Sequence, residues 1–180
     1  MFHFILNWLR HLKHSDMGGI YKYLFGDHQR LDGLLSSAVD VKEGIDTIPY
    51  AEFRKGLLRH IGIEEKLVLP AITRLQSGKQ AEHARRIRLD HGALVALLVP
   101  PPTHGIVETI RLILKSHNSL EEGEGGLYQL MERLAGDEIN DMMEKMKAFP
   151  EVPVLPHRDM PGILDVTRRA VERAGYKARF

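Results

Sequence analysis

The amino-acid sequence predicts an all-α protein: an antiparallel up-and-down four-helix bundle with a short fifth helix and a proline-rich C-terminal strap. Apolar residues recur at intervals of three and four in four long segments, and turn-forming residues separate these segments. No segment shows the sustained two-residue alternation of a half-buried strand. Four long amphipathic helices with short connections favour an antiparallel bundle. With 180 residues, 43% of them hydrophobic and 27% charged, the chain has the size and composition of one globular domain.

Each predicted long helix carries one apolar stripe, and we place these helices at 18–41, 50–76, 80–99 and 104–134. In chain order the stripes are Leu24, His28, Leu31 and Leu35; Phe53, Leu57, His60, Glu64 and Leu67; Ile87, His91, Leu94, Val95 and Leu98; and Ile110, Ile113, Leu114, His117 and Glu121. The run Pro100-Pro101-Pro102 ends the third helix, because proline cannot donate a backbone hydrogen bond. Histidine and glutamate therefore interrupt otherwise apolar faces.

The C-terminal part changes character after a shorter helix predicted near 137–148. Four prolines between Pro150 and Pro161 exclude a helix there and predict an extended strap. A last short helix, at about 162–174, is expected to dock on the bundle. The predicted organisation is thus a helical domain at 18–148 and a strap with a short helix at 149–180.

Residues 1–17 form an apolar N-terminal extension, which we expect to cover one end of the core. A helix lying on a membrane surface is the alternative. The segment lacks the positive leader, long apolar centre and small-residue cleavage site of a signal peptide. No stretch approaches the roughly 18 uninterrupted apolar residues of a membrane helix. We therefore expect no integral membrane segment and, by default, a cytoplasmic protein.

The composition narrows the function classes. Lys plus Arg number 25 and Asp plus Glu 24, so the net charge of +1 gives no electrostatic reason to expect a nucleic-acid partner. The absence of cysteine excludes disulfides, zinc–thiolate sites, iron–sulfur clusters and thiol nucleophiles. Ten histidines are the unusual feature. A transition metal in this chain would have to be bound by imidazole and carboxylate groups.

An internal repeat connects these histidines. The segment Asp27–Leu35 matches Asp90–Leu98 as D-H-x-x-L-x-x-L-L, and His60–Glu65 matches His117–Glu122 as H-x-x-x-E-E. Two helical hairpins therefore carry the same polar groups in the same order. If an approximate twofold axis relates them, four histidines and two carboxylates meet at one level of the bundle.

The spacing of these residues favours a metal site over a structural network of hydrogen bonds. Four residues advance a helix by about 400° and 6 Å, so His60 and Glu64 share a face, as do His117 and Glu121. That face must point to the core, where an unpaired carboxylate costs several kcal/mol. No Lys or Arg lies on these stripes, so a metal ion would supply the missing positive charge.

The donor types select the class of metal. Histidine and carboxylate without thiolate suit iron, manganese or zinc. Six donors on four helices exceed the needs of one tetrahedral site, so two metals are more natural than one. Two histidines for each metal, with two carboxylates spanning the pair, would leave positions open for an outside ligand.

This arrangement resembles the hemerythrin-like, or HHE cation-binding, domain over about residues 20–135. The residues that carry the resemblance are His28, His60-x-x-x-Glu64, His91 and His117-x-x-x-Glu121-Glu122, on successive helices. It implies a four-helix bundle around a non-haem, carboxylate-bridged di-iron centre with these seven residues as candidate ligands. It also implies a small ligand or oxidant such as dioxygen, nitric oxide or peroxide.

The chain departs from the full hemerythrin pattern in two places. Hemerythrins carry His-x-x-x-His on the third helix, and here Ile87 stands four residues before His91. The family also places its last carboxylate five residues after the histidine, at Glu122, whereas the internal repeat favours Glu121. Glu124 is a possible substitute ligand, within a run of glycines that is unusual inside a helix. We assign Tyr128 to core packing in preference to a hydrogen bond at the site.

Three functions fit these residues. The leading interpretation is a hemerythrin-like protein whose iron binds, senses or reacts with dioxygen, nitric oxide or peroxide. A di-iron oxidase or peroxidase-like enzyme would use the same side chains, although ferritin-type oxidases carry Glu-x-x-His and not His-x-x-x-Glu. An iron-stabilised regulatory or interaction module is the third, and the sequence identifies no protein partner for it.

Overall fold

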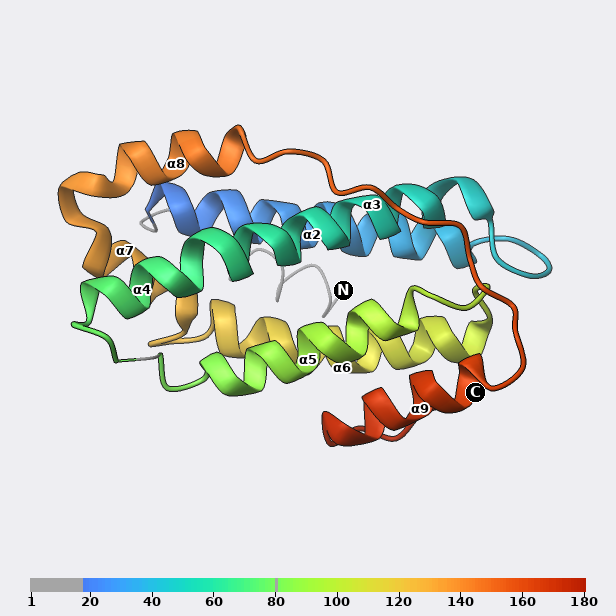
Figure 1. Ribbon diagram of the computed structural model, residues 1–180. Helices are drawn as coiled ribbons and strands as arrows, with labels where there is room; N and C mark the ends of the chain where they lie inside the picture. The colour runs from blue at the N-terminus through green and yellow to red at the C-terminus, as the bar shows by residue number, and fades with distance from the viewer. Residues whose placement is uncertain (1–17, 80) are drawn as a thin grey trace, which may run out of the picture.

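The computed structural model describes residues 18–79 and 81–180, and all of its regular structure in these ranges is helical (Figure 1). The all-α prediction is therefore confirmed for this part of the chain. The elements are α2 (Gly19–Val39), α3 (Thr47–Ile63), η1 (Glu64–Val68), α4 (Leu69–Leu75), α5 (Ala84–Leu97), α6 (His104–Glu122), α7 (Leu127–Ala135), η2 (Gly136–Glu138), α8 (Ile139–Lys147) and α9 (Ile163–Arg173). The predicted extension at 1–17 lies outside the described residues. No described helix is long and apolar enough to cross a bilayer.

The long helices pack in two pairs. Helix α2 lies along α3, and α5 lies along α6, while α2 also contacts α6 (Figure 1). Side-chain caps begin two of these helices: Asp46 accepts a hydrogen bond from the backbone N–H of Ile48, and Thr103 accepts one from Ile106. The caps fix where α3 and α6 start, and so set the register of the polar residues further along each helix.

Two apolar clusters fill the interior, one toward each end of the long helices. One cluster contains Leu24, Ile63 and Ile87, and the other contains Leu31, Leu57 and Leu94. On α2, α3 and α5, members of both clusters flank the in-stripe histidine. The interrupting polar residues therefore lie in a layer between two apolar cores.

The predicted second helix, 50–76, contains a π-helical stretch. Helix α3 runs into η1 at Glu64, and the backbone N–H of Leu69 bonds the carbonyl of Glu64, five residues earlier. Pro70 follows at once, and a proline inside a helix cannot donate to the preceding turn. The wider π-helical turn lies directly before Pro70, and π-helical turns occur frequently at functional sites.

The prediction of one continuous helix at 104–134 is wrong. Helix α6 ends at Glu122 and α7 begins at Leu127, with Gly125 at a φ of +73° in the turn between them. At Gly126 a Cβ atom would lie 2.6 Å from the carbonyl oxygen of Glu121, so only glycine fits there. This turn allows α7 to pack against α2 and α4 as well as α6.

After α8 the chain crosses the helices as an extended strap that leads into α9, which packs on α5 (Figure 1). The backbone N–H of Arg158 bonds the carbonyl of Val99 at 3.0 Å, and the Thr167 hydroxyl bonds the carbonyl of Ala96 at 3.3 Å. Val171 is fully buried in the apolar cluster that contains Leu94. The strap and short helix predicted at 149–180 are both present.

Candidate metal centre

Six polar side chains from the long helices meet in the layer between the apolar clusters. They are His28 on α2, His60 on α3, Glu64 at the start of η1, His91 on α5, and His117 and Glu121 on α6. All six are buried, and the two glutamates have no exposed surface. Burial of this kind excludes bulk water from the carboxylates.

The six residues form two overlapping groups, each with ligand atoms within 4.8 Å of one another. The first group is His28, His60, Glu64 and Glu121, and the second group is Glu64, His91, His117 and Glu121. Each group could hold a metal ion. Both glutamates belong to both groups, whereas each histidine belongs to one.

Glu64 directs one carboxylate oxygen toward each group. Its Oε1 lies 3.3 Å from Nε2 of His60, and its Oε2 lies 3.1 Å from Nε2 of His91. The same carboxylate is thus placed between two histidines from different helical pairs. This is the geometry expected of a carboxylate that spans two cations.

Glu121 repeats the arrangement from the other side. Its Oε2 lies 3.5 Å from Nε2 of His28, and its Oε1 lies 3.2 Å from Nε2 of His117. Glu122, the alternative candidate, belongs to neither group, and its Oε1 lies 2.6 Å from Nδ1 of His28. Glu124 is exposed in the turn after α6, because the helix ends two residues before it.

The ring nitrogens that face away from the centre meet a second layer of carboxylates. Asp27 Oδ2 lies 2.8 Å from Nδ1 of His60, and Glu65 Oε1 lies 2.7 Å from Nδ1 of His91. With the proton on Nδ1 and donated to a carboxylate, Nε2 is left as a lone-pair donor toward the centre. Outer carboxylates of this kind orient metal-binding histidines and make them more basic.

The contact between His117 and its outer acid, Asp90, is longer than those of His60 and His91. Asp90 Oδ2 lies 3.6 Å from its Nδ1, beyond hydrogen-bond distance, and that ring nitrogen has no hydrogen-bond partner. Asp90 instead receives a hydrogen bond from the hydroxyl of Tyr176 at 3.3 Å and pairs with Arg86 at 3.1 Å. The two groups therefore differ in how firmly their histidines are held.

The residues of the internal repeat account for this second layer. The Asp of each D-H pair faces the histidine of the following H-x-x-x-E-E segment, as Asp27 faces His60. The second Glu of each E-E pair faces the histidine of a D-H pair, as Glu65 faces His91. From the sequence alone, Asp27, Glu65 and Asp90 received no role and Glu122 received that of a candidate ligand, although the place of all four in the repeat was the signal.

Without a metal, the centre is held together by charge. Burial opposes protonation of His60, but the charge of Glu64 and the hydrogen bond with Asp27 outweigh it and raise its pKa to about 10. The pKa of His117 is likewise raised well above its ordinary value, since Glu121 outweighs the effect of burial. Burial would raise the pKa of Glu64, but the charge of His60 outweighs it and lowers the pKa. Protons thus occupy the position that a cation would take.

Tyr128, assigned from the sequence to core packing, is both fully buried and part of the centre. Its hydroxyl donates to Glu64 Oε1 at 2.6 Å and lies 3.1 Å from Glu121 Oε2. The same oxygen lies 3.1 Å from Nε2 of His28 and 3.3 Å from Nε2 of His60. A hydroxyl has one proton, so at most one of these contacts is its donated bond. The phenol oxygen sits among the four donors of the first group, and the glycine turn before α7 brings it there.

The donor set fits a metal ion by its charge. Among the acids in and around the centre, described Lys and Arg side chains pair only with the outer ones: Arg30 pairs with Asp27, Arg88 with Glu65 and Arg86 with Asp90. In the described part of the chain, Glu64 and Glu121 form ion pairs with histidines and not with Lys or Arg. Oε1 of Glu121 is buried without a hydrogen-bond partner. Two buried carboxylates are therefore left for histidinium or a cation to balance.

A surface pocket of about 240 Å³ reaches the first group between α2 and α6. His28 lines it together with Leu31, Asp32, Arg111, Leu114, Lys115 and Asn118. A small molecule could approach the first group through this opening. Ile87, by contrast, is fully buried in the apolar cluster, one turn before His91.

Compared with models of known protein families, with curated proteins and with solved structures, the chain has no match.

Proposed function

We propose that this protein is a hemerythrin-like, non-haem di-iron protein that binds, senses or reacts with dioxygen, nitric oxide or peroxide. The observation that carries the proposal is the sharing of Glu64 and Glu121 by two groups of histidines. In this assignment His28 and His60 would hold one iron, His91 and His117 would hold the other, and Glu64 and Glu121 would serve both. Glu122 is then the partner that orients His28.

The up-and-down four-helix bundle belongs to the same proposal. Its four members would be α2, the α3–η1–α4 run, α5 and α6, in chain order. The pairing of α2 with α3 and of α5 with α6 supports it, as does the contact of α2 with α6. In the described part of the chain, α7, η2, α8 and α9 would be additions to this bundle.

Iron is the proposed metal because the donors are imidazole and carboxylate, without thiolate. Each group would offer its iron two histidines and two carboxylate groups. The phenol oxygen of Tyr128 is the proposed fifth donor to the iron held by His28 and His60. The second iron would keep one more open position.

The protein's own part is to hold these donors rigidly and to keep water out. Asp27 and Glu65 fix the rings of His60 and His91, and both apolar clusters enclose the layer. When bound, iron supplies an open coordination position and a change of oxidation state. A ligand small enough to enter beside His28 would meet a dry, preorganised site.

One feature favours an oxidase or peroxidase-like enzyme as a second candidate. The phenol of Tyr128 is an oxidisable group in direct contact with the first group of donors. Mixing reduced, iron-loaded protein with oxygen in a stopped-flow instrument distinguishes the two functions. A long-lived adduct supports binding or sensing, and fast oxidation with turnover supports the enzyme.

Metal content tests the proposal directly. Protein purified from iron-containing medium is expected to hold about two irons per chain, and the variant Glu64→Ala less than half as much. A content of one iron per chain would contradict the proposal that Glu64 and Glu121 are shared by two irons. A fully helical protein without metal, also after incubation with ferrous iron, would overturn the proposal and leave a hydrogen-bonded network.

A further inference from the structure

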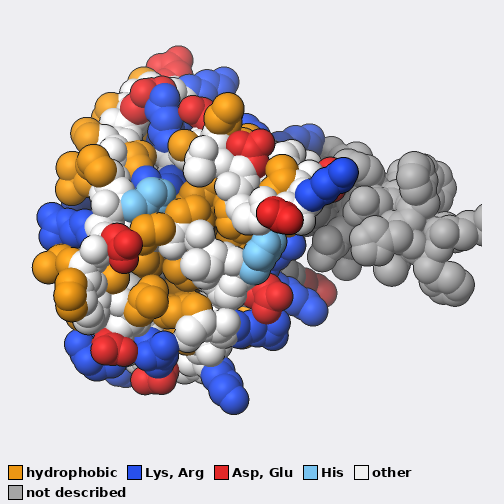
Figure 2. All heavy atoms as spheres, turned by 90° about the vertical axis from the view of Figure 1, so that its right-hand side faces the viewer, with side chains coloured by type: hydrophobic (Ala, Val, Ile, Leu, Met, Phe, Trp, Pro, Cys, Tyr) orange, Lys and Arg blue, Asp and Glu red, His pale blue; other side chains and the backbone are white. Residues whose placement is uncertain are grey.

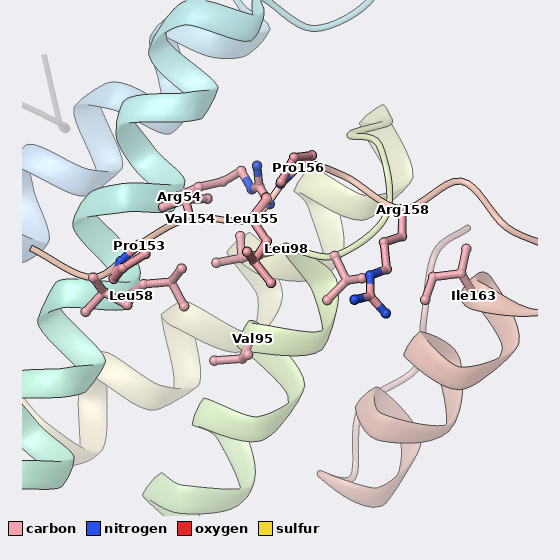
Figure 3. Close-up of a pocket in the computed structure, with 12 residues that line it drawn as sticks. Arg54, Leu58, Val95, Leu98, Pro153, Val154, Leu155, Pro156, Arg158 and Ile163 are labelled. Atoms are coloured by element: carbon pink, nitrogen blue, oxygen red, sulfur yellow. The ribbon is translucent and has the colours of Figure 1, made fainter.

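A second pocket, which shares no residue with the candidate metal centre, lies where the strap crosses the helices. Its volume is about 330 Å³, at the lower end of the roughly 300–1,000 Å³ of small-molecule sites. Figure 3 shows it between α3, α5, the strap and the start of α9. The apolar residues that line it are Leu58, Val95, Leu98, Val99, Val152, Pro153, Val154, Leu155, Pro156 and Ile163.

Two arginines complete the lining, and no acidic residue does. Arg54, on α3, is only 8% exposed, whereas Arg158, on the strap, is exposed. In Figure 3 they approach the pocket from opposite ends. The space-filling view of the neighbouring end of the molecule shows hydrophobic side chains exposed between charged ones (Figure 2).

Arg54 is a buried cation whose charge is not balanced by a carboxylate in the described part of the chain. Its Nη2 donates to the carbonyl of Leu155 at 3.0 Å, and its Nε is buried without a hydrogen-bond partner. Burial lowers its pKa, which reflects the cost of the unbalanced charge. A buried charge normally has a partner of opposite sign, because its desolvation costs several kcal/mol.

Two further polar atoms without a hydrogen-bond partner belong to residues that interact with this guanidinium. The hydroxyl of Tyr50, one helical turn before Arg54, is buried without a partner, and so is Nδ1 of His157. The rings of Tyr50 and His157 stack with centroids 6.1 Å apart. Hydrogen-bonding capacity is thus collected beside an apolar pocket whose described lining contains no acidic residue.

We propose that this pocket binds a small amphipathic carboxylate, a short- to medium-chain fatty acid or a molecule of that shape. The carboxylate would pair with the planar guanidinium of Arg54, which matches its two oxygens. The aliphatic chain would lie against Leu58, Val95 and Leu98. A single buried guanidinium balances one negative charge, which favours a carboxylate over a doubly charged phosphate.

Calorimetric titration with octanoate tests the proposal, with 1-octanol as the uncharged probe of equal chain length. We expect one octanoate per chain and at least tenfold weaker binding of 1-octanol. Arg54→Met keeps an unbranched, flexible side chain, although a shorter one, and removes its charge, so it should weaken octanoate at least tenfold and remove the preference over 1-octanol. Lys55→Gln is the matched control: Lys55 follows Arg54, is partly exposed and does not line the pocket, so this variant should bind as the unaltered protein does.

A second variant leaves the charge in place. Val95 lines the pocket and is 38% exposed, so Val95→Trp should fill the pocket from its open side and abolish octanoate binding while helicity is kept. Absence of saturable octanoate binding to the unaltered protein overturns the proposal, and so does equal affinity for 1-octanol. Iron content is measured on the same samples, so failure here is distinguishable from failure of the metal centre.

Discussion

The hydroxyl of Tyr128 donates a 2.6 Å hydrogen bond to Oε1 of Glu64, the carboxylate oxygen that faces the first group of donors. Tyr128→Phe removes this donor and leaves Glu64 buried. We expect the metal-free variant to lose about 1–3 kcal/mol of unfolding free energy in urea denaturation. If the phenol oxygen binds iron, the optical spectrum of the iron-loaded variant must also lose intensity in the charge-transfer region.

Tyr23→Phe is the control for this experiment, because the Tyr23 hydroxyl bonds the carbonyl of Met146 outside the centre. Its spectrum should match that of the unaltered protein. An unchanged spectrum in Tyr128→Phe would assign Tyr128 to hydrogen bonding alone.

Removal of a donor that faces the centre should empty it. His60→Ala takes away one proposed ligand and leaves Glu64 without its nearest histidine, so we expect most of the iron to be lost in elemental analysis. His83→Ala should retain its iron, because His83 precedes α5 and belongs to neither group. The reverse result would show that the inward face of α3 is assigned incorrectly.

The outer carboxylates should change the affinity for iron although they provide no ligand atom themselves. Asp27→Asn keeps the shape of the side chain but removes the charge that orients His60. We expect iron affinity to fall about 10- to 100-fold, measured by competition with a chelator, at unchanged stoichiometry. Asp137→Asn, at an exposed position in η2, is the matched control. Equal affinities in the two variants would count against a role for the second layer.

The metal-free protein should become less stable as the pH rises above neutrality. The pKa of His60 is raised from 6.5 to about 10, and the pKa values of His91 and His117 are also raised. A histidine whose pKa is raised by folding stabilises the protein fully when the pH is below its pKa in the unfolded chain. This stabilisation is lost as the pH rises through its pKa in the folded protein.

Glu64 acts in the opposite sense, because its pKa is lowered from 4.5 and its contribution is lost in acid. The unfolding free energy should therefore be greatest between about pH 4.5 and 6.5 and fall by a few kcal/mol toward about pH 10. Each unit of difference between the folded and unfolded pKa of a group corresponds to about 1.4 kcal/mol. Urea unfolding of metal-free protein at a series of pH values measures this. A rise in stability over the alkaline range would contradict the charge network.

Much of the candidate centre could be predicted from spacing alone. The four-residue interval places His60 above Glu64 and His117 above Glu121 in any α-helix, and both residues of each pair lie together in the structure. The repeat predicted that the two pairs and two further histidines would meet. These inferences needed only helical geometry and the cost of a buried charge.

What the sequence did not predict depends on relations between helices. The distance from Asp27 to His60 depends on how α2 is rotated against α3, and no periodicity encodes that rotation. Tyr128 reaches the centre only because the chain turns at Gly125 and Gly126. The run of glycines in the sequence is unusual for a helix and indicates an irregularity. It does not predict the direction of α7, because that direction depends on how α7 packs.

The repeat also means that neither half of the chain can build a complete site. The first hairpin supplies His28, His60 and Glu64, and each of the two groups still needs Glu121 from the second. Two copies of the first hairpin, joined through an isologous interface, would in principle supply the same six donors. Such a homodimer would lack the hydroxyl, because Ala71 stands seven residues after Glu64, where Tyr128 stands seven after Glu121. Covalent linkage of two unequal halves is what allows one candidate metal position to differ from its neighbour.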